Sequence, residues 1–281
     1  MDRPAWWSWA GLSVIALGMG LAAADVGLAA QNLTPICWTG FIFAVDGVLA
    51  ARGRSWVRDA PGELALMAAI SVPSWLLFEL YDRPRFWTVS GPELWWHYSG
   101  LPPWPWRGLG YAWSFATIMP AVLLLAALLE PAAARLAGRG AGGRVPKELG
   151  AALSCAGAIL AVVPLLWPSV YFAADVWLAW PLLLDPVNHA LGRPSVLGDL
   201  EAGRRSRPLS LLASGLACGV LWESWNWISS ARWSYSVPFL GGVKLYEMPV
   251  LGFLGFAPFA LAVFALYHFL RGLLPGRPPA P

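Results

Sequence analysis

Long apolar stretches separated by short polar segments run along the whole chain. Eight of these stretches have about the 20 residues that an α-helix needs to cross a hydrocarbon core of about 30 Å. The pattern therefore predicts an all-α membrane protein with eight transmembrane helices. The stretches cover residues 6–25, 33–51, 64–81, 110–130, 149–167, 170–190, 209–229 and 249–271.

Two of the predicted helix ends are marked in the sequence. Arg52-Gly53 follows the second stretch and is expected to close that helix. Glu130-Pro131 follows the fourth stretch, and proline cannot continue a helix interior because it lacks the backbone N–H. We therefore expect the fourth helix to end at Glu130.

The composition agrees with a membrane location. Hydrophobic residues make up 58% and charged residues 12% of the 281 residues, whereas a soluble domain has about 45–50% and about 25%. These values exclude a soluble globular protein, a disordered chain, a coiled coil and a nucleic-acid-binding module. The net charge of +3 is spread over many short loops and indicates no polyanionic partner. Cys37, Cys155 and Cys218 lie in apolar runs and match neither a disulfide framework nor a zinc site.

The basic residues are divided unevenly between the two sets of loops. Of the 19 lysines and arginines, all but five fall in the termini and in segments 52–63, 131–148 and 191–208. Because cytoplasmic loops retain positive charge, this bias predicts that both termini are cytoplasmic. We expect a multi-pass protein of the bacterial inner membrane, with the lipid bilayer as its surroundings. The five basic residues on the outer side are Arg83, Arg85, Arg107, Arg232 and Lys244.

The two halves of the chain repeat each other. Each half contains four predicted helices, an even number, so both halves enter the membrane the same way round. We expect two parallel four-helix repeats, residues 1–140 and 141–281, related by a pseudo-twofold axis near the membrane normal. The matches are Trp38, Asp46, Gly53 and Arg54 with Trp177, Asp185, Gly192 and Arg193; Phe78, Glu79, Tyr81 and Asp82 with Trp222, Glu223, Trp225 and Asn226; Trp96 and Tyr98 with Trp233 and Tyr235; and Phe115 and Pro120 with Phe253 and Pro258.

One layer of polar residues lies toward the predicted outer side of the helices. It contains Glu79 and Asp82, then Glu223 and Asn226, with Glu247 just before the eighth helix. Within each pair the two side chains are three residues apart, so they project from one helix face. An acidic side chain inside a membrane span costs free energy, and it usually faces a polar partner or a cavity. These five residues are the candidate catalytic groups; in the alternative interpretation the carboxylates are structural and pair with the outer arginines and lysine.

A second polar layer lies at the predicted cytoplasmic ends. Asp46 and Asp185 are each followed eight residues later by an arginine, Arg54 and Arg193. The aspartates either cap or anchor helix ends or form an acidic functional layer. Asp185 and His189 are four residues apart and could share a metal, but two ligands are few, and we predict no metal site.

Aromatic side chains surround the outer acids. The chain contains 19 tryptophans, more than an interfacial belt explains. A buried carboxylic acid among aromatic faces suits carbocation chemistry, because the acid can protonate an alkene and each ring can stabilise the cation by about 0.5–2 kcal/mol. The candidate substrate-binding residues are Trp75, Trp96, Tyr98, Trp222, Trp225, Trp233 and Tyr235.

Two long outer loops, residues 82–109 and 231–248, are candidates to cover or line this site. The chain contains no phosphate-binding loop, nucleophile elbow, dinucleotide fingerprint or zinc-protease motif. We therefore expect no cofactor.

The layout resembles the integral-membrane lycopene cyclases, cofactor-free carotenoid cyclases with repeated helical units. The resemblance covers residues 38–130 and 177–271 and rests on Asp46 with Arg54, on Glu79 with Trp96-His-Tyr98, and on their repeat partners. The layout is also similar to that of uncharacterised, duplicated bacterial membrane proteins with related aromatic-acid motifs. The Pro-x-Glu-Glu motif of the cyclases is absent, and Glu247-Met-Pro249 stands in its place.

Two classes of function follow from these observations. The first is an enzyme that acts on a long apolar isoprenoid or polyene by proton-initiated cyclisation, isomerisation or hydration. The second is a non-enzymatic membrane protein, either a small-solute transporter or a subunit of a membrane complex, and a homo-oligomer is compatible with both. The concentration of acids and tryptophans at one depth favours the enzyme.

Overall fold

The computed structural model describes residues 3–83, 93–238 and 242–276 of the chain. The protein is 73% helical and contains eleven α-helices in this described part. Four short strands form two separate two-stranded ladders. Arg85, one of the predicted outer basic residues, lies outside the described residues.

Seven helical segments are long and apolar enough to cross a membrane, so the prediction of a multi-pass helical membrane protein is confirmed at this level. The shorter elements and one further long helix, α10 (Ser206–Ile228), lie between these segments in the chain. Helix α10 is less apolar because it contains serines, a glutamate and an asparagine. The seven segments are α1 (Trp6–Ala23), α3 (Leu33–Ala50), α5 (Pro61–Asp82), α6 (Trp106–Ala137), α7 (Lys147–Leu166), Val170–Ala190 and Val250–Arg271. The segment Val170–Ala190 comprises η2 (Val170–Phe172) and α8 (Ala173–Ala190), and Val250–Arg271 comprises η3 (Val250–Gly255) and α11 (Phe256–Arg271).

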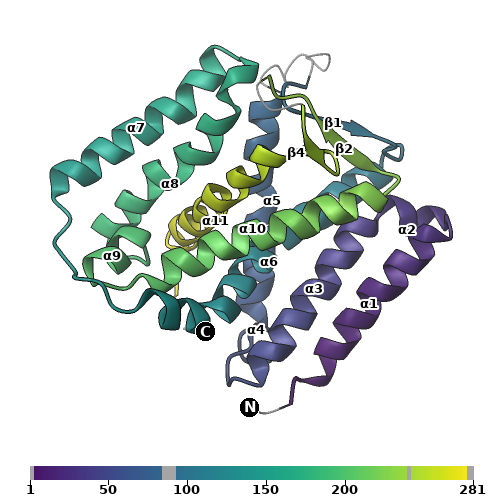
Figure 1. Cartoon of the computed structure of the whole chain (residues 1–281), viewed down its shortest axis with the longest axis horizontal. Coiled ribbons are helices and arrows are strands. Elements are labelled where there is room, and N and C mark those ends of the chain that lie inside the picture. The colour runs from purple at the N-terminus through teal and green to yellow at the C-terminus, as the bar shows by residue number, and fades with distance from the viewer. Residues whose placement is uncertain (1–2, 84–92, 239–241, 277–281) are drawn as a thin grey trace.

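The helices form one bundle with two distinct ends (Figure 1). Helices α1 and α3 lie on one side and α7 and α8 on the other, with α5, α6, α10 and α11 between them. The short helices α4 (Trp56–Asp59) and α9 (Val196–Glu201) lie at the end that holds both chain termini. The strands β1 (Trp96–Ser99), β2 (Arg232–Tyr235), β3 (Lys244–Leu245) and β4 (Met248–Pro249) lie at the opposite end, as does α2 (Gly27–Gln31).

Glycines allow α1 and α3 to pack closely. A Cβ atom at Gly11 would lie 2.3 Å from the carbonyl oxygen of Gly40, and a Cβ at Gly47 would lie 2.5 Å from Cβ of Ser8. Side chains at these positions would push the two helices apart. Small residues are the usual means of close helix contact where lipid removes the hydrophobic driving force.

The predicted end of the fourth helix at Glu130 is wrong, because α6 continues through Pro131 to Ala137. Proline at this position has no N–H to donate to the carbonyl of Ala127, so the helix continues with one hydrogen bond fewer. The guanidinium group of Arg52 donates a hydrogen bond of 2.9 Å to the carbonyl of Leu128, in the turn before Pro131. The prediction for the second helix is confirmed: α3 ends at Ala50, and Gly53 follows with a φ of 76°.

Strands β1 and β2 join the two long outer loops. They pair antiparallel, with Trp96 opposite Tyr235 and Tyr98 opposite Trp233. Because side chains alternate between the faces of a strand, these four aromatic residues share one face of the ladder. The described parts of the loops therefore bring their aromatic side chains together over the end of the helix bundle.

Candidate functional site

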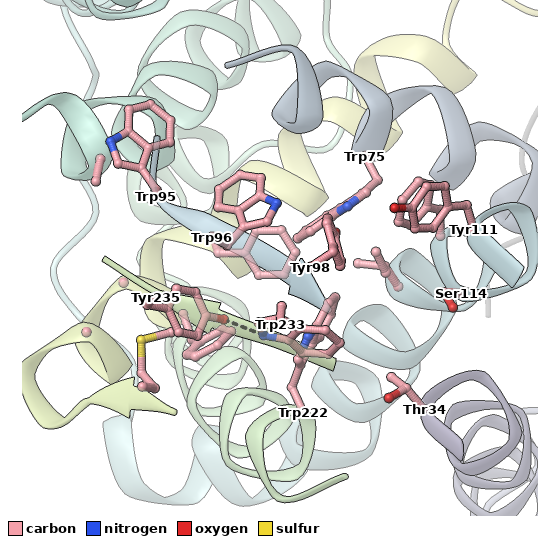
Figure 2. A pocket seen from close by; sticks show the side chains of 18 of the residues that line it. Thr34, Trp75, Trp95, Trp96, Tyr98, Tyr111, Ser114, Trp222, Trp233 and Tyr235 are labelled. Carbon is pink, nitrogen blue, oxygen red and sulfur yellow. Dashed lines mark hydrogen bonds between the residues drawn. The ribbon is translucent and has the colours of Figure 1, made fainter. Parts of the chain in front are cut away.

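A cavity of about 320 Å³ lies between the strand ladder and the adjoining helix ends. A volume of this order accommodates a ligand of drug size. Figure 2 shows Trp75, Trp95, Trp96 and Tyr98 along one side of it, facing Trp222, Trp233 and Tyr235. The other large side chains that line it are Trp38, Arg107, Tyr111, Phe115, Tyr171, Trp177, Met248, Phe256 and Phe259.

The Trp75 ring is a centre of the aromatic packing. Its centroid lies 5.3 Å from that of Trp222, 5.9 Å from Phe115 and 6.2 Å from Trp96. Ring pairs at these separations stabilise each other by about 0.5–1.5 kcal/mol beyond the burial of their surface. The wall is therefore firmly packed and presents π-faces to whatever occupies the cavity.

Glu79 on α5 lies directly behind this wall. Its Oε1 accepts a hydrogen bond of 2.9 Å from Trp75 Nε1 and one of 2.6 Å from the Tyr98 hydroxyl. Trp75 and Tyr98 line the cavity, whereas Glu79 is not among the lining residues. The acid thus contacts the cavity through two side chains that separate it from the occupant.

Glu223 on α10 has a matching arrangement and is fully buried. Its Oε1 accepts hydrogen bonds from the Tyr235 hydroxyl at 2.8 Å and from Trp233 Nε1 at 3.3 Å. Trp233 Nε1 also donates to the Tyr235 hydroxyl at 2.8 Å. The second oxygen, Oε2, has no hydrogen-bond partner in the described part of the chain. An uncharged carboxylic acid satisfies this geometry better than a carboxylate does, because a buried charge requires partners on both oxygens.

The two tyrosines act as hydrogen-bond donors. Burial, followed by the nearby Glu79, raises the pKa of Tyr98 well above its ordinary value. Burial and Glu223 do the same to the pKa of Tyr235. Both hydroxyl groups therefore stay protonated at neutral pH and hold the carboxyl groups in place.

Asp82 and Asn226, the third residues after the two glutamates, position the strands. Oδ1 of Asp82 accepts backbone hydrogen bonds from Trp95 at 2.7 Å and Trp96 at 3.1 Å. The Asn226 amide pairs with the backbone N–H and carbonyl of Trp233. Each side chain thus anchors the strand that carries the aromatic residues.

Glu247 and Trp225 lie at the margins of the site. Glu247 lies in the tight turn between β3 and β4, close enough to Glu223 to interact electrostatically with it. Trp225 is buried and packs edge-to-face against Trp38, with ring centroids 4.8 Å apart, rather than lining the cavity. The structure therefore groups the other candidate aromatics around the cavity and leaves these two residues outside its lining.

The second polar layer lies at the opposite end of the bundle and caps helices. Asp46 accepts hydrogen bonds from Ser55 Oγ at 2.7 Å and from the backbone N–H groups of Trp56 and Val57 at the start of α4. Asp185 accepts hydrogen bonds from two backbone N–H groups at the start of α9. Anions at helix N-termini are stabilising because the first N–H groups have no partner within the helix.

The arginines of this layer differ in their contacts. Arg193 donates to the carbonyls of Phe269 and Gly272 at the end of α11. Arg54 Nε is buried without a partner in the described part of the chain. His189 pairs with Glu201 at 2.9 Å, so it and Asp185 have separate partners. Within the described ranges, no group of three or more His, Cys, Asp or Glu side chains could hold a metal.

The change Asp46→Asn is expected to destabilise the fold by about 2 kcal/mol, because an amide nitrogen would face donor groups that now bind a carboxylate. Thermal unfolding of the purified protein in detergent measures this effect. Asp25→Asn is the control, since Asp25 is exposed and its replacement should leave the unfolding temperature nearly unchanged. Equal unfolding temperatures for all three proteins would contradict the capping role of Asp46.

Several residues of the cavity were not predicted. Trp38 and Trp177 line the cavity, and the predicted repeat had paired them without assigning them to the site. Thr34, Tyr111 and Ser114 carried no signal in the sequence, because their role depends on which helix faces the cavity. Comparisons with protein-family models, curated proteins and solved structures found no match for this chain.

Proposed function

We propose that α10 is an eighth membrane span and that the chain consists of two parallel four-helix repeats. Both halves use an aspartate to cap a short helix, Asp46 for α4 and Asp185 for α9. The ladder of β1 and β2 pairs Trp96 with Tyr235 and Tyr98 with Trp233. Exchanging each residue for its repeat partner leaves this pairing unchanged, as a twofold axis through the ladder requires.

Ring contacts support the same pseudo-symmetry. Phe41 and Trp225 have centroids 6.3 Å apart, and the corresponding pair, Trp180 and Tyr81, has centroids 6.4 Å apart. The 139-residue and 144-residue shifts of the repeat relate these pairs. Both termini and both capped helices lie at the end of the bundle with most basic loops, which supports an inner-membrane protein with cytoplasmic termini.

We infer that the protein is a membrane-embedded enzyme acting on an isoprenoid or polyene lipid by proton-initiated chemistry. The observation that carries this proposal is the pair of glutamates, Glu223 fully buried and Glu79 partly buried, each bound by a tyrosine and a tryptophan of the cavity wall. The apolar lining suits a hydrocarbon chain, and the rings suit a cation. The resemblance to integral-membrane lycopene cyclases adds to this proposal.

In the proposed reaction Glu223 is the proton donor. Because Glu223 itself does not line the cavity, its proton passes through the Tyr235 hydroxyl: the hydroxyl gives its proton to an alkene carbon and takes the proton of the Glu223 carboxyl group. The hydrogen bond from Trp233 stabilises the carboxylate that forms. The adjacent carbon becomes the cation and is stabilised by Trp75 and Trp222. Attack by a second double bond or by water, followed by return of a proton to Glu223, completes cyclisation or hydration.

The alternative functions receive less support from the contacts. Asp46 and Asp185, the acids that a transport path through the cytoplasmic half would use, are engaged in helix capping. The cavity lies at the strand end of the bundle, together with Glu79 and Glu223. This distribution fits a site for a bound lipid better than a path across the bundle.

The test is expression of the chain in bacteria that accumulate lycopene, followed by chromatography and mass spectrometry of the pigments. A new species of equal mass indicates cyclisation or isomerisation, and a species heavier by one water indicates hydration. If product formation persists when both Glu79→Gln and Glu223→Gln are present, the acid mechanism is wrong. If no product forms, the carotenoid substrate is wrong, and the transporter or complex-subunit function becomes the leading hypothesis.

A further inference from the structure

One wall of the cavity carries unpartnered polar groups. Thr34 and Trp38 lie one helical turn apart on α3, so both face the same side of that helix. They line the cavity with only 7% and 2% of their surface exposed. Thr34 Oγ1 and Trp38 Nε1 have no hydrogen-bond partner among the described residues. Buried hydrogen-bonding groups are costly to leave unpaired, which points to a partner outside the protein.

The neighbouring helix α6 adds a cation to the same wall. Arg107, Tyr111 and Ser114 line the cavity from the first turns of α6. Figure 2 shows Thr34, Tyr111 and Ser114 at one end of the cavity, away from Trp95 and Tyr235. The Nε of Arg107 donates to the carbonyl of Pro102 at 3.0 Å, and no ion pair joins its guanidinium group to an acid in the part of the chain that the structure describes. No acidic side chain is among the cavity-lining residues.

The second half lacks the threonine, the serine and the arginine of this wall, although Trp177, the repeat partner of Trp38, also lines the cavity. Under the proposed repeat, the 139-residue shift places Ala173 opposite Thr34, and the 138-residue shift places Gly252 opposite Ser114. Both Ala173 and Gly252 line the cavity. The same shift gives Leu245 as the counterpart of Arg107. The first half therefore supplies a cation and two hydroxyl groups to the cavity wall, and apolar residues take their places in the second half of the sequence.

We propose that the wall formed by α3 and α6 is a head-group subsite, which binds an anionic carboxylate or phosphate at one end of an isoprenoid chain. This inference rests on the proposed function and narrows its substrate class from hydrocarbons to anionic amphiphiles. Arg107 neutralises the head group, and the Thr34 hydroxyl and the Trp38 N–H donate hydrogen bonds to its oxygens. The apolar chain then lies along the aromatic wall in front of Glu79 and Glu223.

The test is a binding titration with the purified full-length protein in detergent. All-trans-retinoic acid and retinol share one polyene chain and differ in the head group, and each quenches tryptophan emission when bound. We expect the wild-type protein to bind the acid about tenfold more tightly than the alcohol. Arg107→Gln should abolish this preference and leave the affinity for retinol unchanged. Arg107→Lys should retain part of the preference, which controls for folding.

A matched control uses the exposed Arg232 on β2, which lies at the same end of the bundle but does not line the cavity. Arg232→Gln should keep the tenfold preference for the acid. Equal affinity for acid and alcohol in the wild-type protein, a preference that survives Arg107→Gln, or no binding of either retinoid would each overturn the subsite.

Two further measurements separate the possible outcomes. Displacement of retinoic acid by geranylgeranyl monophosphate, but not by geranylgeraniol, would extend the subsite to phosphate; displacement by neither would restrict it to carboxylate. Binding is measured without turnover. A preserved preference for the acid without any pigment product would support the subsite and exclude lycopene as the substrate. A pigment product without this preference would overturn the subsite and leave the proposed catalysis standing.

Discussion

Replacement of Glu63 by alanine is expected to lower the stability of the protein by about 3–5 kcal/mol. Glu63 begins α5 and is 8% exposed, and it binds Arg271 at the end of α11, which is 6% exposed. The Arg271 Nε contacts Oε1 at 2.8 Å and Oε2 at 3.1 Å, and the Tyr267 hydroxyl also donates to Oε1. The mutation would leave a buried guanidinium group without its counter-charge. The measurement is the unfolding temperature in detergent, which should fall by about 10 °C.

An exposed ion pair provides the control for this prediction. Arg58 and Asp59 pair at 2.7 Å, but their side chains are 51% and 47% exposed, so Asp59→Ala should leave the unfolding temperature nearly unchanged. Replacing Glu63 by leucine and Arg271 by methionine together should restore most of the stability, because no unpaired charge remains. If the double variant is as unstable as Glu63→Ala, the loss comes from packing and not from the unpaired charge.

The second large effect concerns catalysis. Under the proposed mechanism, Glu223→Gln is expected to reduce product formation in the pigment assay by about 10²–10⁴-fold, because general acid catalysis contributes about this much. Tyr235→Phe should reduce it by a similar factor, since the hydroxyl passes the proton from the acid to the cavity. The ratio of product to lycopene, measured at equal protein levels, quantifies both effects.

The tyrosine Tyr81 offers a matched control, because its hydroxyl donates to the carbonyl of Ala161 away from both glutamates. Tyr81→Phe removes a buried hydrogen bond of similar length and should leave product formation unchanged. The corresponding changes in the first half, Glu79→Gln and Tyr98→Phe, show which repeat holds the donor. If Glu79→Gln abolishes the product and Glu223→Gln does not, the assignment of the donor is reversed.

The helices could be predicted from the sequence because the bilayer imposes its thickness on the chain. Each predicted apolar stretch corresponds to a helical segment, and seven of these segments are apolar enough to span a membrane. The predicted end of the fourth helix at Glu130 was wrong because α6 tolerates Pro131 and continues to Ala137. Proline lowers the local preference for a helix, but Arg52 from another segment binds a carbonyl in the preceding turn, and this contact cannot be inferred from the residues around Pro131.

The candidate site could be predicted in its chemistry but not in its arrangement. Because acids inside apolar stretches and clustered tryptophans are unusual, their positions alone led to the prediction of Glu79, Glu223 and the surrounding rings as site residues, and most of these rings line the cavity. The pairing of β1 with β2 joins segments more than a hundred residues apart, and it decides which rings face one another. Only this pairing shows that the tyrosines separate the glutamates from the cavity.

Composition and periodicity, read from the sequence alone, determined that this is a helical membrane protein rich in aromatic residues, with acids inside its apolar stretches. Such features depend on hydrophobicity and residue spacing within short stretches of the sequence. The tertiary structure decided that Asp46 and Asp185 cap helices, that Thr34 and Arg107 share a cavity wall, and that Trp225 packs outside the cavity lining. These outcomes depend on which faces of distant helices meet, and that is set by packing of the whole bundle.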